Sequence, residues 1–83
     1  MKILPISAKI LSQLTKYSLE TKFKKQITLL LSNPRHPGLH LELLEPKQHG
    51  IYSFRIGRKF RALCIFRPDT GDLEILAITV HYH

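Results

Sequence analysis

Apolar residues recur at steps of three and four through the first third of the chain, which is the spacing of one face of an α-helix. The first such stripe comprises Ile6, Ile10, Leu11, Leu14 and Tyr17. The second comprises Leu19, Phe23, Ile27, Leu30 and Leu31, while Lys22, Lys24, Lys25 and Gln26 lie mostly off that face. We therefore expect two amphipathic helices that form a hairpin.

Local signals mark where these helices begin and end. Ser7 is a suitable N-cap for the first helix, because its hydroxyl can accept a free backbone N–H. Asn33-Pro34 ends the second helix, since the residue before a proline is displaced from helical geometry. Before both helices, residues 2–4 predict a short strand that ends at Pro5.

The apolar period changes to two in the second half of the chain, which indicates β-strands. We expect strands at residues 51–56, 60–67 and 73–82, joined by short turns that pair them antiparallel. Residues 39–44 are ambiguous between an irregular strand and an extended loop. The order β-α-α-β-β-β predicts an α+β fold, with a two-helix hairpin packed on one face of a small antiparallel sheet. Residues 1–83 have the length of a single domain.

Side-chain alternation sets two arginines opposite each other in this sheet. The first two of these strands carry apolar sets that must face the helices, namely Phe54 with Ile56, and Phe60 with Ala62 and Cys64. That register brings Arg55 opposite Arg61 on the other face. Like charges so placed are unfavourable by about 0.2–1 kcal/mol unless an anion or a carboxylate lies between them. The pair predicts a phosphate clamp; the alternatives are that each side chain points into solvent, or that Glu42 or another acid neutralises both.

The charge balance favours a polyanionic partner. Thirteen Lys and Arg against six Asp and Glu give a formal net charge of +7. Nucleic acid, an acidic protein or an anionic surface would suit this excess, although it also serves solubility in many small basic proteins. Arg58, Lys59 and Arg67 either extend the basic surface around the arginine pair or are solvated turn and strand-end charges.

Other chemistry is less well supported by the residues. Cys64 is the single cysteine and lies in an apolar run, which predicts a packing residue rather than a nucleophile. Five histidines are present, and His81 and His83 are spaced to share a strand face, but no Cys or acidic pattern completes a zinc site. We expect no metal and no cofactor. No segment has the pattern of a signal peptide or the length of a membrane span, so we expect a cytoplasmic protein.

Three motifs, taken in order, resemble the RelE/ParE toxin superfamily. They are Asn33-Pro34-Arg35-His36-Pro37-Gly38-Leu39 after a basic helix, then Tyr52-Ser53-Phe54-Arg55-Ile56-Gly57 followed by Phe60-Arg61, and the ending Val80-His81-Tyr82-His83. The last of these is similar to the Tyr-His-Tyr end of the YoeB branch. The family fold, β-α-α-β-β-β, agrees with the order predicted above. The resemblance implies the toxin of a type II toxin–antitoxin system, a ribosome-dependent endoribonuclease that cuts mRNA without a metal.

The resemblance also implies catalytic roles. A base must take the proton from a ribose 2′-hydroxyl, a cation must stabilise charge on the attacked phosphate, and an acid must protonate the leaving 5′-oxygen. Glu42 matches the base, Arg61 the cation and His83 the acid. Glu45 and His81 are the alternatives for the base and the acid.

The remaining candidates are expected to contact RNA. Arg55 matches a basic position of the family, and a side chain such as Tyr82 can stack on a base. The full set expected to bind RNA or phosphate is Arg55, Arg58, Lys59, Arg67, His81 and Tyr82. Tyr52, by contrast, is expected on the core side of its strand.

The expected partners are the ribosome with its mRNA and a cognate antitoxin. The antitoxin would be an acidic, partly disordered segment that folds over the basic site. Two alternatives remain open for the function. One is a ParE-like toxin that inhibits DNA gyrase by binding, and the other is a degenerate member that binds its antitoxin without catalysis.

Overall fold

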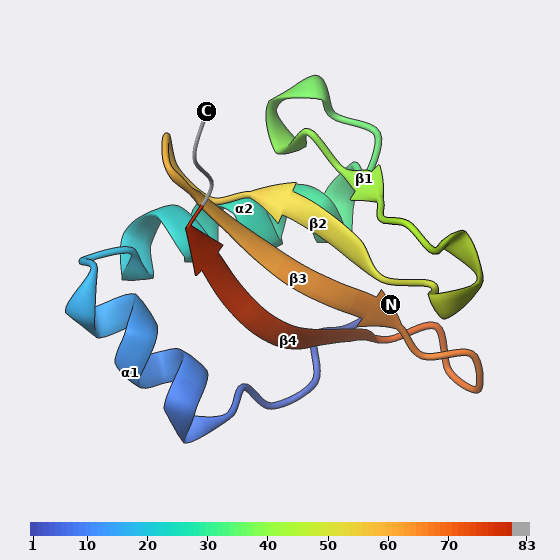
Figure 1. Ribbon diagram of the computed structural model, residues 1–83, viewed down its shortest axis with the longest axis horizontal. Coiled ribbons are helices and arrows are strands. Elements are labelled where there is room, and N and C mark those ends of the chain that lie inside the picture. Colours follow the sequence, from blue (N-terminus) through green and yellow to red (C-terminus); the bar gives the residue numbers. More distant parts are fainter. Residues whose placement is uncertain (81–83) are drawn as a thin grey trace.

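Two helices and a four-stranded antiparallel sheet make up the computed structural model, which describes residues 1–80 (Figure 1). In chain order the elements are α1 (Ala8–Lys16), α2 (Glu20–Ser32), the short 3-10 helix η1 (Pro37–Leu39), β1 (Glu42–Leu43), a second 3-10 helix η2 (Lys47–His49), β2 (Tyr52–Arg55), β3 (Phe60–Phe66) and β4 (Leu73–Val80). Neighbouring strands pair in the order β1-β2-β3-β4. The α+β class predicted from the sequence is therefore confirmed.

The start of α1 and the end of α2 lie where the local signals place them. The Ser7 hydroxyl accepts the backbone N–H of Ile10 at 3.2 Å, which satisfies one free donor at the start of α1. After α1 the chain turns through Ser18, whose φ of 55° is left-handed. Helix α2 ends at Ser32, directly before Asn33-Pro34. The two helices are thus joined by a turn of only a few residues.

The expected N-terminal strand is reduced to a single bridge. Ile3 pairs with Leu73 in parallel orientation, supported by backbone bonds from Leu4 N–H to the Leu73 carbonyl (2.8 Å) and from Leu73 N–H to the Lys2 carbonyl (2.9 Å). Pro5 has no N–H to continue this ladder, so the pairing stops there. The sheet itself therefore starts with β1, which forms within the stretch that was ambiguous in the sequence.

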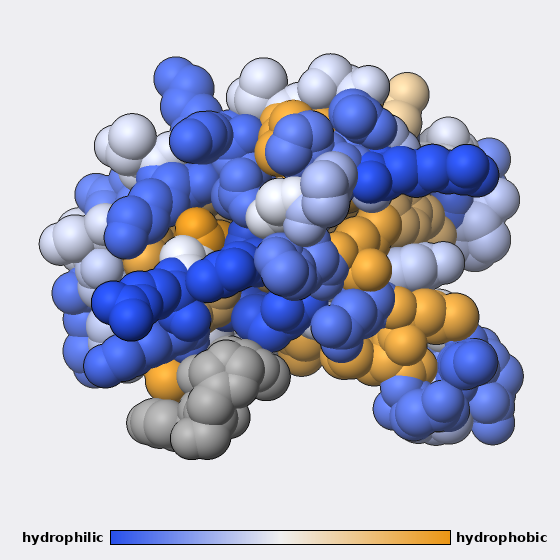
Figure 2. Space-filling view, turned by 90° about the horizontal axis from the view of Figure 1, so that it is seen from above, coloured by the Kyte–Doolittle hydropathy of each residue, from blue (hydrophilic) through white to orange (hydrophobic). Residues whose placement is uncertain are grey.

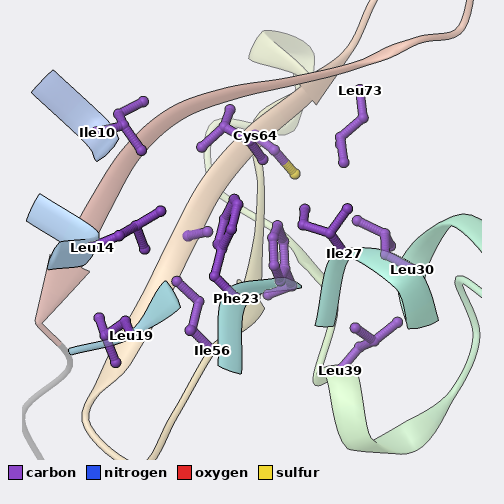
Figure 3. Close-up of a cluster of buried hydrophobic side chains, with 13 residues drawn as sticks. Ile10, Leu14, Leu19, Phe23, Ile27, Leu30, Leu39, Ile56, Cys64 and Leu73 are labelled. Atoms are coloured by element: carbon purple, nitrogen blue, oxygen red, sulfur yellow. The ribbon is translucent and has the colours of Figure 1, made fainter. Parts of the chain in front are cut away.

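One face of the sheet packs against the helices (Figure 1). The alternating residues Phe54, Ala62 and Cys64 are fully buried there, together with Leu30 of α2 and Leu39 of η1 (Figure 3). Fully burying a Leu or Phe side chain stabilises a fold by about 1.5–3 kcal/mol. Because the core occupies this face, the alternate side chains of β2 and β3 are directed to the other face.

The register between β2 and β3 is the one that the apolar pattern requires. Phe54 pairs with Ala62 and Arg55 pairs with Arg61, and the Ile56 N–H donates to the Phe60 carbonyl at 3.0 Å. Tyr52 is half-buried against the core, as expected, with its ring 5.2 Å from that of Phe66 between centroids.

Candidate functional site

Arg55 and Arg61 are directly opposed on the sheet face that the helices leave uncovered. Both side chains are half-buried. Among residues 1–80 the only ion pairs are those that Arg67 makes with Asp69 and Glu74. Neither Glu42 nor another described acid therefore neutralises the two arginines, which was one of the alternatives raised by the sequence.

The guanidinium group of Arg61 is held in place by uncharged acceptors. Its Nε donates to the Ser53 hydroxyl at 3.0 Å. Its Nη2 donates to the Ser53 carbonyl at 3.3 Å and, by a short bond, to the His40 carbonyl. Nη1 makes no hydrogen bond within the described part of the chain. A charged donor with fixed geometry and two uncommitted N–H groups is suited to bind an oxyanion.

His40 and Ser53 join this site, although the sequence did not single them out for it. Ser53 is buried, with 3% of its surface exposed, between β1 and β3 on the arginine face. His40 has a left-handed φ of 47°, which turns its carbonyl toward Arg61 while its Nε2 lies 3.4 Å from Nη1 of Arg55. Nε2 can accept that bond only in the tautomer with its proton on Nδ1. In the sequence, the only signal for Ser53 was its position two residues before Arg55, which places it on the same face of the sheet as Arg55 and Arg61.

Glu42 lies beside Arg61 in a shallow hollow of about 180 Å³. Its pairing with Ser53 sets it at the edge of the sheet, where the carboxylate is exposed. The other residues lining the hollow are Leu44, Ser53, Leu63 and Thr79. The proposed base and the proposed phosphate-stabilising cation thus open onto one space without forming an ion pair with each other. Glu45, the alternative base, does not line it.

The other predicted site residues are distributed differently. Arg58 and Lys59 are exposed in the turn between β2 and β3. Arg67 lies at the opposite end of β3 from Arg61, where it donates to Glu74 at 3.0 Å, so the structure does not bring it to the arginine pair. His81, Tyr82 and His83 lie outside the described residues. Hydrophilic side chains cover much of the face that includes η1 and the β2–β3 turn (Figure 2).

Residues 1–80 contain neither a cluster of metal-ligating side chains nor a helix able to span a membrane. No three His, Cys, Asp or Glu side chains in this part of the chain are grouped so that they could hold a metal ion. None of its helices combines the length and the apolar character needed to cross a bilayer.

Comparison with known proteins gives one partial similarity. No protein-family model matches the sequence. A stretch of 45 residues, 54% of this chain, is 38% identical to an uncharacterised protein of Haemophilus influenzae. The match spans 43% of that protein, less than half of its length, and that protein's name gives no activity.

Proposed function

We propose that this protein is a RelE-like toxin, an endoribonuclease that cuts mRNA during translation. The observation that carries the proposal is the Arg55–Arg61 pair: two opposed cations on an uncovered face, with no acidic partner among the described residues. Such an arrangement is unfavourable in isolation and becomes favourable when a phosphate lies between the two side chains. The ordered motifs that resemble the RelE/ParE superfamily support the same conclusion.

The proposed reaction needs no group beyond side chains and the RNA. Glu42 takes the proton of a ribose 2′-hydroxyl, whose oxygen forms a bond to the adjacent phosphorus. The bond from phosphorus to the 5′-oxygen then breaks, and an acid protonates that oxygen. His83 or His81 is proposed for the acid. The products are a 2′,3′-cyclic phosphate on one fragment and a 5′-hydroxyl on the other.

Arg61 is proposed to stabilise the charge that develops on the phosphate oxygens. Its bonds to Ser53 and His40 fix the guanidinium before substrate arrives, so little reorganisation accompanies the reaction. Removing one donor of this kind from an active site typically slows a reaction about 10²–10³-fold. Arg55, on the neighbouring strand, is proposed to bind the same phosphate or the next one.

A cognate antitoxin is part of the proposal. An acidic, partly disordered segment would cover the arginine face and compete with RNA for it. Association of this kind should weaken as the salt concentration rises, because it depends on opposite charges.

Inducible expression in bacteria tests the proposal. The variants are the wild type, Arg61→Ala, Glu42→Ala and, as a control, Arg67→Ala, which removes an arginine that lies apart from the arginine pair and is paired with Glu74. Growth is followed together with the 5′ ends of cellular mRNA. We expect growth arrest with new 5′ ends inside translated frames for the wild type and Arg67→Ala, and neither effect for Arg61→Ala.

Two results would contradict the proposal. Growth arrest without mRNA cleavage would instead indicate a protein target, as for the gyrase-directed branch. A folded wild-type protein without toxicity would indicate a non-catalytic member that binds an antitoxin.

A further inference from the structure

A second hollow lies between α2 and the β2–β3 turn, and His40 is among the residues that line it. Its volume is about 330 Å³. No acidic residue lines it. Four cationic side chains do, namely Lys22, Lys25, Arg55 and Arg58. The hollow of Glu42 and Arg61 is lined by different residues throughout.

The position of α2 explains why the lysines face this hollow. Lys25 and Gln26 follow Lys22 by three and four residues, so both are its neighbours on the same side of the helix. The Gln26 side-chain amide fixes that side against the sheet, since its Nε2 donates to the Arg55 carbonyl at 2.7 Å and to the Gly38 carbonyl at 3.2 Å. The turn approaches the helix closely: a Cβ added at Gly57 would lie 3.5 Å from Cδ of Lys22.

Four cations around one hollow repel one another unless an anion enters. Lys22, Lys25 and Arg58 are exposed, and none of the four makes an ion pair with an acid in the described part of the chain. Lysine ammonium groups bind phosphate as mobile point charges, and arginine adds a planar pair of donors. This combination suits a phosphate group better than an apolar or cationic ligand.

The hollow continues the site proposed for catalysis. Arg55 lines it, and Arg61, which lines the first hollow, is the cross-strand partner of Arg55. Cβ atoms of directly opposed residues are about 5 Å apart. His40 connects the two, with its carbonyl on Arg61 and its ring beside Arg55. A nucleic-acid strand held at Arg61 would therefore carry a neighbouring phosphate into this hollow.

We propose that the hollow of Lys22, Lys25, Arg55 and Arg58 is a second phosphate subsite, which binds single-stranded RNA next to the phosphate held at Arg61. The assignment of RNA rests on the proposed function. The subsite holds the strand and takes no part in bond cleavage, so its loss weakens binding rather than altering the chemistry.

The test measures binding of a short 2′-O-methyl RNA that lacks the attacking hydroxyl and so is not cut by the proposed reaction. Fluorescence anisotropy gives the Kd at several salt concentrations for the wild type, for Lys22→Gln/Arg58→Gln, and for Lys9→Gln/Lys47→Gln. The last variant removes the same net charge from exposed positions outside both hollows. Thermal unfolding shows that each variant is folded. A polyglutamate peptide is measured in parallel.

We expect the hollow variant to bind RNA roughly tenfold more weakly than the matched control, and the slope of log K against log salt to fall by about 0.7 for each lost phosphate contact. Equal RNA binding by the two double variants, or no RNA binding by the wild type, would overturn the subsite. So would an equal loss of polyglutamate binding, because it would indicate a surface for acidic protein. The proposed function is judged separately, by mRNA cleavage in cells, so the two ideas can fail independently.

Discussion

Arg61 is held by three hydrogen bonds, and every acceptor is an uncharged oxygen of Ser53 or His40. A carboxylate partner would fix the same side chain but would also offset its charge and compete with a substrate phosphate. Holding the guanidinium with a hydroxyl and two carbonyls fixes its geometry and leaves its charge for a ligand. Ser53 and His40 are therefore proposed as residues that position the Arg61 guanidinium, His40 through its left-handed backbone.

Cys64 is expected to be unreactive in the folded protein. Burial raises the pKa of its thiol from 9.0 to about 12, so almost no thiolate forms near neutral pH. A disulfide reagent such as DTNB should label the native protein very slowly at pH 8 and label it promptly in urea. Prompt labelling without denaturant would mean that the side chain is accessible.

The same shift predicts how stability depends on alkaline pH. Because the folded-state pKa is raised, the contribution of the neutral thiol is fully present below pH 9 and is lost as the pH rises from 9 toward 12. The difference in urea midpoint between the wild type and Cys64→Ala should therefore shrink over that range. A difference that stays constant across it would contradict the prediction.

At the scale of elements, the site depends on how α2, η1 and β2 are joined. The core stripe of α2 fixes which helix face is buried, and Gln26 links the helix to the Gly38 and Arg55 carbonyls. Through these two bonds the Gln26 side chain fixes the distance from α2 to η1 and to β2. The apolar pattern predicted which face of α2 is buried, but nothing in that pattern distinguished Gln26 from an exposed polar residue.

Gln26→Leu should destabilise the fold. The variant keeps the size of the side chain but removes two hydrogen bonds, one of them part-buried and 2.7 Å long. A loss of about 1–3 kcal/mol in the free energy of unfolding is expected. Urea denaturation measures it, with Lys24→Leu as the control on an exposed position of the same helix. Equal stability of the two variants would exclude a structural role for the Gln26 amide.

Asp72 is expected to hold the N-terminal segment against β4. Its carboxylate accepts the backbone N–H of Lys2 at 3.0 Å, and this bond is the main reason that its pKa is lowered from the usual 3.8. Because the folded pKa is depressed, the contribution to stability is present above pH 3.8 and is lost as the pH falls through the folded pKa. Asp72→Ala should lower the urea midpoint at pH 7, and the difference from wild type should diminish in acid. Asp69→Ala, in an exposed turn, serves as the comparison.

At the scale of the whole molecule, the apolar period predicted the α+β class, whereas the contacts made by loops were not predictable. The alternation of apolar residues alone placed Arg55 opposite Arg61, because shifting the pairing of the two strands by one residue would have put charge into the core. The expected strand at residues 2–4 is only a single bridge at Ile3, flanked by two backbone hydrogen bonds to Leu73. His40 was not foreseen because its role depends on a left-handed backbone, which only a few per cent of non-glycine residues adopt.

The distribution of charged side chains over the surface is also a property of the whole molecule. The formal net charge of +7 is a property of composition, but the fold places cations in both hollows, and Glu42 is the one described acid that lines either of them. A surface of this kind would attract RNA at a distance and would be sensitive to salt. Within this surface, the arginine face around Arg61 is the part proposed to bind the acidic antitoxin.

The most direct measurement is the chemistry of the cut ends when the purified protein acts on a message bound to ribosomes. We expect fragments with a 5′-hydroxyl and a 2′,3′-cyclic phosphate, formed only on translated message, and at least about 10²-fold slower with Arg61→Lys, which keeps the charge but not the planar donors. Arg67→Lys should cut like the wild type. Cleavage of ribosome-free message at the same rate, fragments with 5′-phosphates, or an Arg61→Lys protein of undiminished rate would contradict the proposed active site.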